Sequence, residues 1–288
     1  MKRFFPTAIF VLVMNVPAAF GQFTAITDMF STAGGLTGTT PSSGVGSWTT
    51  ISGSSGLAVA SGKLTIAGVG GEASQLNFSS SNLTSGTVYM GFSYSVSSSG
   101  TISTSDSISA IAGFRVGTAG SGTYAVGLGD FRPSAAAQTF SSVPSTSTSQ
   151  VVLGIFTGSS LNASSSTLTA WPTPINRGAT YRVVLGFDLT NNTATLWLNP
   201  TSTSSTSVTL SAVSSDARGV FFREGAATHG NISILNLNVS NDFSTAAAIP
   251  EPSTYAAFFG GAALMAAGWH RRRRSQSRRG RCLNRVDV

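Results

Sequence analysis

Apolar and polar residues alternate with a period of two over several long stretches of the chain. In 88–96 every second side chain is apolar, from Val88 to Val96, and 108–116 repeats the pattern. This alternation is typical of a strand that turns one face toward a core. The clearest case is 181–198, where two alternating runs flank Thr190-Asn-Asn-Thr193, and asparagine tolerates the left-handed backbone of a tight reversal. The pattern predicts a β-hairpin there.

Shorter alternating runs predict further strands, and no segment of the exported part shows a sustained helical stripe. These further strands are expected at 57–60, 63–69, 75–79, 123–129, 151–157, 206–212, 219–223 and 231–239. Short strands separated by Gly, Ser and Thr turns favour an all-β fold, an antiparallel β-sandwich over 22–244. Three serine-rich stretches, 97–107, 134–149 and 159–169, are predicted to be surface loops.

Residues 1–21 have the organisation of a secretory signal peptide. Lys2 and Arg3 give a positive start, an apolar run follows to Val16, and small residues precede Gly21. Such a segment directs export and is cleaved, here between Gly21 and Gln22. A retained N-terminal anchor is the alternative, but the apolar run is short and the cleavage site is good.

A second targeting pattern occupies 245–274. A linker leads to Pro250, Glu251 and Pro252, whose prolines keep the backbone extended. The run 255–269 then has 15 residues and no charge; as a helix it spans roughly 22 Å, less than the ~30 Å hydrocarbon layer. A basic cluster follows, formed by Arg271, Arg272, Arg273 and Arg274. This order predicts a short transmembrane helix held with its arginines in the cytoplasm.

These three parts together resemble the PEP-CTERM sorting signal of Gram-negative bacteria. The resemblance implies that an exosortase recognises Pro250, Glu251 and Pro252 at the inner membrane and removes the tail. It also implies export to the cell surface or extracellular matrix, with transient membrane anchoring. An ordinary C-terminal anchor is the alternative. This chain departs from the family in continuing with a basic tail, 275–288.

A second resemblance concerns the ectodomain. The hairpin 181–201, with its Leu-Trp-Leu-Asn-Pro ending, looks like a hairpin of many PEP-CTERM exoproteins, and 232–239 looks like their final strand. Those domains are similar to concanavalin A/laminin-G-like jelly rolls. The resemblance implies that architecture and no particular activity.

The charge of +7 belongs mainly to the two targeting segments. Between Gln22 and Ala248 seven basic side chains face eight acidic ones, a net charge of −1. The basic ends report membrane topology rather than nucleic-acid binding. The lone cysteine, Cys282, lies in the tail, so no disulfide supports the exported domain.

Catalytic and metal-binding patterns are scarce in 22–248. A glycosidase needs two close carboxylates, and the two glutamates, Glu72 and Glu224, are far apart in sequence. His229 is the one histidine, without a Gly-x-Ser-x-Gly elbow. We therefore expect no enzyme and no cofactor. Structural calcium is open in principle, but no Asp-x-Asp-x-Asp-Gly loop is present.

Four residues are candidates for ligand binding. Trp48 and Trp171 lie in turn-rich surroundings and could stack on a sugar, and Asp130 and Arg132 follow the strand 123–129 and could line a ligand loop. Packing for the tryptophans, and pairing or turn capping for Asp130 and Arg132, are the alternatives. Three functions follow: a non-catalytic surface or matrix protein associated with exopolysaccharide, a lectin-like domain with polysaccharide as partner, and a glycan-cleaving enzyme.

Overall fold

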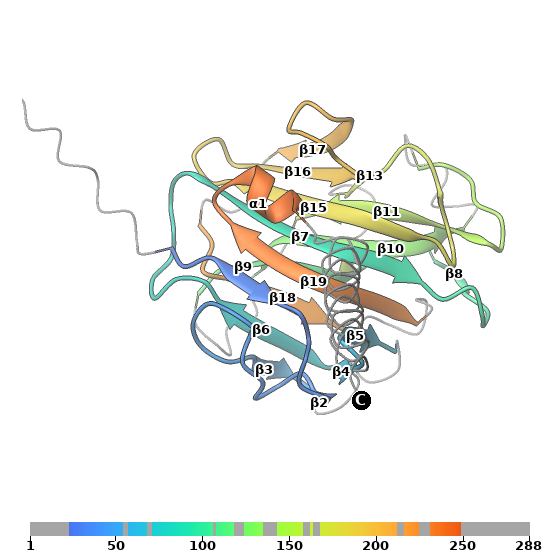
Figure 1. Cartoon of the computed structure of the whole chain (residues 1–288). Coiled ribbons are helices and arrows are strands. Elements are labelled where there is room, and N and C mark those ends of the chain that lie inside the picture. Colours follow the sequence, from blue (N-terminus) through green and yellow to red (C-terminus); the bar gives the residue numbers. More distant parts are fainter. Residues whose placement is uncertain are drawn as a thin grey trace, which may run out of the picture. The chain divides into compact units, whose positions relative to one another are not determined.

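The computed structural model describes residues 23–53, 57–67, 71–105, 108–117, 124–134, 143–157, 162–163, 168–211, 216–224 and 231–248. Their strands form two sheets (Figure 1). In sheet A the strand order is β17 (Ser207–Ser211), β16 (Thr193–Leu198), β15 (Thr180–Asp188), β7 (Thr87–Val96), β19 (Ile232–Ser240), β5 (Lys63–Ile66), β4 (Leu57–Ala60) and β2 (Gly34–Gly35). The short β1 (Ile26–Asp28) pairs with β19 on the same edge as β5. All these pairings are antiparallel.

Sheet B lies against sheet A and contains the remaining long strands. Its order is β13 (Leu168–Ala170), β11 (Gln150–Phe156), β10 (Tyr124–Pro133), β9 (Ile108–Arg115), β18 (Gly219–Arg223), β6 (Ala73–Asn77) and β3 (Thr49–Ser52). Three two-residue strands attach to it: β12 (Asn162–Ala163), β14 (Ile175–Asn176) and β8 (Thr104–Ser105). The predicted all-β antiparallel sandwich is confirmed, with the β8–β10 pair as a parallel exception.

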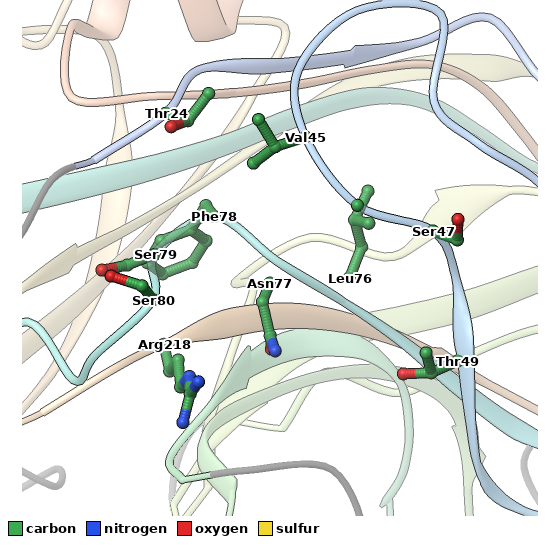
Figure 2. A pocket seen from close by; sticks show the side chains of 11 residues that line it. Thr24, Val45, Ser47, Thr49, Leu76, Asn77, Phe78, Ser79, Ser80 and Arg218 are labelled. Carbon is green, nitrogen blue, oxygen red and sulfur yellow. The ribbon is translucent and has the colours of Figure 1, made fainter.

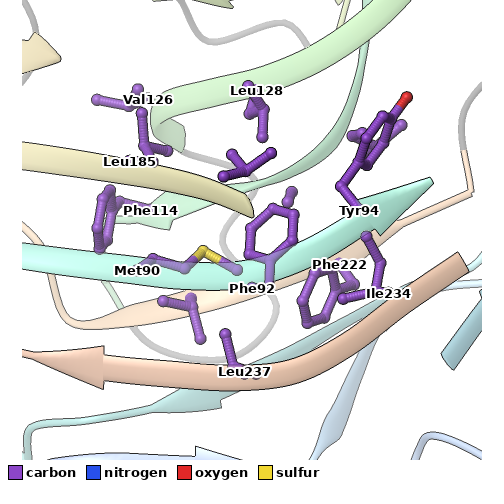
Figure 3. Packing of buried hydrophobic residues seen from close by; sticks show 14 of the residues in the cluster. Met90, Phe92, Tyr94, Phe114, Val126, Leu128, Leu185, Phe222, Ile234 and Leu237 are labelled. Carbon is purple, nitrogen blue, oxygen red and sulfur yellow. The ribbon is translucent and has the colours of Figure 1, made fainter. Parts of the chain in front are cut away.

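The core lies between the sheets. Met90, Phe92 and Tyr94 of β7 point across to side chains of sheet B such as Phe114 and Phe222 (Figure 3). Alternate residues of each long strand are fully buried, because the period of two sends every second side chain to the same face. Burial at about 25 cal/mol per Å² of apolar surface is the main source of stability in a domain without disulfides.

The predicted hairpin is confirmed as β15 and β16, which pair from Val183–Leu198 to Asp188–Thr193. Asn192 has the expected positive φ, 52°. The carboxylate of Asp188 accepts hydrogen bonds from the N–H groups of Thr190 and Asn191, which closes the turn. Of the further strands, 57–60 and 219–223 coincide with β4 and β18.

A short helix, α1 (Phe243–Ala247), covers the outer face of sheet A and contacts β7, β15 and β19 (Figure 1). Phe243 packs edge-on against Trp197, with ring centroids 5.1 Å apart. Trp197 is thus packed beneath the helix and is 7% exposed. Gly91 permits the close approach, since a Cβ there would lie 1.9 Å from the Ala246 carbonyl oxygen.

Two expectations need correction. The linker was expected to start at Thr245, but 245–247 belong to α1 and the compact unit extends to Ala247. The stretches 97–107 and 159–169 are not wholly loop: they contain β8, β12 and the start of β13, and Ile102 is buried. Both contribute because their backbone N–H and C=O groups pair with a neighbouring strand, β8 with β10 and β12 with β9. The targeting segments 1–21 and 249–288 lie outside the described residues.

Candidate functional site

An open groove of about 590 Å³ lies beside β6 (Figure 2). One wall is the loop that carries Val45, Gly46 and Ser47, and the floor is β6 with the segment that follows it. Its lining consists of Thr24, Val45, Gly46, Ser47, Thr49, Leu76, Asn77, Phe78, Ser79, Ser80 and Arg218. We call it the Arg218 groove. Sequence-distant residues meet here because β6 pairs with both β3 and β18.

The Arg218 groove combines hydrogen-bonding groups with a small aliphatic surface. Val45 is 53% exposed, the one large hydrophobic side chain exposed in the described ranges. Arg218 is partly buried, and its Nε has no hydrogen-bond partner there. The Asn77 amide and several hydroxyl groups also line the groove, and no carboxylate does. Phe78 is fully buried and offers no ring face.

A second hollow of about 300 Å³, the Arg132 pocket, is lined by Ser98, Gly100, Thr101, Ile102, Arg132, Thr148, Ser149 and Arg177. Arg177 holds its wall together by donating to the carbonyl oxygens of Ser97, Ser99, Gly100 and Thr148 at 2.7–3.1 Å. Arg132 projects from β10 and donates from Nη1 to the carbonyl oxygen of Ile102 at 3.3 Å.

The two tryptophans singled out as sugar platforms are packed in the core. Trp48 is 1% exposed; its Nε1 donates to Asp28 Oδ2 at 2.8 Å and its ring lies 5.5 Å from Phe222. Trp171 is 7% exposed and belongs to the same cluster. Neither indole is placed to stack on a sugar, and both take the packing role given as the alternative, because turn-rich neighbours can close over an indole as readily as display it.

Asp130 does not lie in a ligand loop. β10 continues through it to Pro133, and the side chain points between the sheets with 0% exposure. Its Oδ2 accepts the Tyr94 hydroxyl at 2.6 Å, which joins β10 of sheet B to β7 of sheet A. Burial first, and the Asp130 charge second, raise the pKa of Tyr94 well above its ordinary value. The Arg132 pocket thus keeps only Arg132 of the predicted residues.

The two glutamates, far apart in sequence, are neighbours at the adjoining ends of β6 and β18. The N–H of Glu224 donates to the carbonyl oxygen of Glu72 at 2.8 Å. The Glu72 carboxylate accepts the Leu57 N–H and the Thr37 hydroxyl. The two residues are 4% and 0% exposed. A glycan chain therefore has no path to either carboxylate in the part of the chain that is described.

The same described ranges bear on metal binding and on membrane spanning. No group of three or more His, Cys, Asp or Glu gathers within them in a way that could hold a metal ion. Among the helices described there, none is long and apolar enough to span a bilayer. His229 and the predicted run 255–269 lie outside those ranges.

Sequence reasoning missed the residues that line the hollows, apart from Arg132. Val45 had a usable signal, since a β-branched residue amid Ser and Gly is hard to bury in a turn. Arg177 and Arg218 had none, because only the strand register brings them beside their neighbours.

Comparisons with known proteins give the following. No protein-family model matches the chain, and no curated protein matches it. Solved structures do: the VIP36 exoplasmic/lumenal domain in a Ca²⁺/Man3GlcNAc-bound form has 10% identity and a TM-score of 0.42, covering 72% of this chain and 87% of that one. The metal-free Emp46p carbohydrate recognition domain has 10% identity and a TM-score of 0.39, with coverages of 67% and 88%. Peanut lectin has 12% identity and a TM-score of 0.38, and the match covers 62% of this chain and 86% of the lectin.

Proposed function

We propose that the β-sandwich is a non-catalytic glycan-binding domain and that the Arg218 groove is its binding site. The observation that carries the proposal is the lining of this groove. It sets amide, guanidinium and hydroxyl groups beside an exposed aliphatic side chain, with no acid among them. Sugars present dense hydroxyl groups and small C–H patches, so they match such a lining.

Asn77 and Arg218 supply the directional contacts. Within the described ranges, neither side chain forms a hydrogen bond with another part of the protein. An amide both donates and accepts, whereas a guanidinium only donates, so together they suit vicinal hydroxyls. Val45 faces the same space across the groove (Figure 2) and supplies the apolar contact.

The groove lacks an exposed aromatic ring, which limits the affinity of a single site. Binding then depends on hydrogen bonds that replace water, each with a net gain of only about 0.5–1.5 kcal/mol. We expect dissociation constants nearer millimolar than nanomolar for short oligosaccharides. Repeated epitopes on a long polysaccharide raise the apparent affinity without new contacts.

A glycan array followed by calorimetry on the purified protein tests the proposal. Asn77→Ala should weaken binding of the best oligosaccharide several-fold, because it removes a donor and an acceptor from the groove. Asn176→Ala is the matched control, since Asn176 is exposed on β14 and lines neither hollow. Equal affinities of the two variants, or no glycan bound at all, would refute the assignment.

We further propose that the protein is exported and sorted to the cell surface or matrix by an exosortase. Support comes from the sequence: the signal peptide in 1–21, then Pro250-Glu251-Pro252, the apolar run 255–269 and Arg271–Arg274. Combined with glycan binding, sorting of this kind would make the protein a structural component of an exopolysaccharide-rich matrix.

Sorting is tested in cells that have the exosortase. Glu251→Ala should leave the chain membrane-retained with its tail uncut, while export by the N-terminal signal continues. Neutralising Arg271–Arg274 should instead weaken the membrane stop and release unprocessed chain. Mass measurement on each fraction distinguishes the two. Normal processing of Glu251→Ala would identify the run as an ordinary anchor.

A further inference from the structure

We propose that the Arg132 pocket binds the carboxylate of an acidic sugar, such as a uronic acid residue of a polysaccharide. The inference rests on the proposed glycan-binding function and adds a second site with its own ligand chemistry. The two sites are separate, because the Arg132 pocket and the Arg218 groove share no lining residue.

The first argument is charge. Two guanidinium groups line this small hollow, and none of its eight lining residues is acidic. Every protein acceptor of the two side chains in the described ranges is a main-chain carbonyl oxygen. Carbonyl dipoles satisfy N–H donors but leave the net positive charge in place. An anion that enters is therefore met by two cations, and no acid among the lining residues neutralises them.

The second argument is donor capacity. Arg177 uses four hydrogen bonds to hold its loops, so it is fixed and mainly supplies charge. Arg132 is different: it makes one hydrogen bond to Ile102, and its buried Nε has no partner. A guanidinium has five N–H donors in a planar fork that fits the two oxygens of a carboxylate. Arg132 is thus the residue available to bind the carboxylate of the ligand.

The third argument is the wall. Ser98, Thr101, Thr148 and Ser149 surround the two arginines with exposed hydroxyl groups. Hydroxyls can donate to a carboxylate and can also bond the neighbouring sugar hydroxyls. Asp130, two residues before Arg132, is fully buried with its Oδ2 bonded to the Tyr94 hydroxyl, and it is not among the residues that line the pocket. The composition suits an anionic sugar better than a neutral one or a cation.

The test compares oligomers of galacturonate with neutral glucan oligomers of the same length, by calorimetry on the purified protein. We expect tighter binding of the galacturonate. Arg132→Gln should weaken galacturonate binding by about tenfold or more, the scale of a charge-assisted hydrogen bond, and leave neutral glycans unaffected. Arg182→Gln has the same change in net charge outside both hollows and should stay within twofold of the parent.

Three further arms make the result decisive. Raising the salt concentration should weaken galacturonate binding in the unmodified protein, which needs no variant to fold. Arg132→Lys should keep part of the binding. Free acetate should compete poorly, because it lacks the sugar contacts; full competition by acetate would indicate a simple anion site. Equal binding of acidic and neutral oligomers, or identical effects of Arg132→Gln and Arg182→Gln, overturns the inference. Loss of neutral binding in Asn77→Ala bears only on the Arg218 groove.

Discussion

The interior of the sandwich and its two hollows treat charge in opposite ways. Asp28, Asp130, Glu72 and Glu224 are all at most 4% exposed, whereas arginines line the hollows without any acid beside them. The domain is nearly neutral, yet these four acids are buried in the core, while Arg132, Arg177 and Arg218 line hollows at the surface. Net charge therefore says little about what such a surface attracts. The distribution of charge does.

The largest effect should follow from removing an interior acid. Asp28→Ala leaves the Trp48 indole N–H and the Phe30 N–H, now bonded at 2.8 Å each, without their acceptor inside the core. Each stranded donor costs about 1–3 kcal/mol, so unfolding free energy should fall by roughly 2–6 kcal/mol. Urea denaturation measures it. For comparison, Arg218→Gln changes an arginine that lines a hollow, and it should change the free energy of unfolding by less than about 0.5 kcal/mol.

A similar loss in Arg218→Gln would break the contrast, because it would give that arginine a structural role. An unchanged midpoint for Asp28→Ala would do so from the other side, since it would mean that the Asp28 carboxylate contributes nothing to the core.

Tyr94→Phe should have an intermediate effect, because it removes a hydrogen bond to Asp130 that crosses between the sheets. The expected loss is about 1.5–3 kcal/mol at neutral pH. The pKa of Tyr94 is raised in the folded state, so unfolding releases a proton above pH ~10 and the parent loses stability as pH rises past that point. Denaturation at pH 8 and pH 11 should show a shallower loss in Tyr94→Phe.

Part of the alkaline loss will remain in that variant, because burial also raises the pKa of Tyr89 and Tyr124. An identical pH slope in parent and variant would show that the Tyr94 hydroxyl is not held as described.

The smallest effect should come from Asp242, an acid at the surface rather than inside. Hydrogen bonds from Ser244 and Thr245 lower the pKa of Asp242 to about 2 and fix the start of α1. Asp242→Ala should lower the melting temperature less than Tyr94→Phe does. The difference from the parent should be full above pH ~4 and disappear as pH falls through about 2. A pH-independent difference would indicate a cause other than the carboxylate.

Sequence pattern predicted the long strands well, because burial of alternate side chains enforces a period of two. It missed β1 and β2, which are too short to show a period, and β3, whose Thr-Thr-Ile-Ser has a single apolar residue. All three depend on a neighbouring strand for their hydrogen bonds. The sites were harder. Asn77 and Arg218 lie together because Asn77 pairs with Gly219, and the same register places Glu72 opposite Glu224. The pairing of strands determines which of these residues become neighbours, and local composition does not reveal it.

The direction of β7 gives the domain two distinct ends. Its first residues lie beside Ser240 of β19, next to where β1 starts and α1 follows, so the chain enters and leaves there. Its far end runs into Ser98–Ile102, which form a wall of the Arg132 pocket. Ten residues of strand separate these ends by about 30 Å. The Arg132 pocket and the point where the chain leaves the sandwich therefore lie at opposite ends of β7, so a glycan held in the pocket would not meet the residues of that exit.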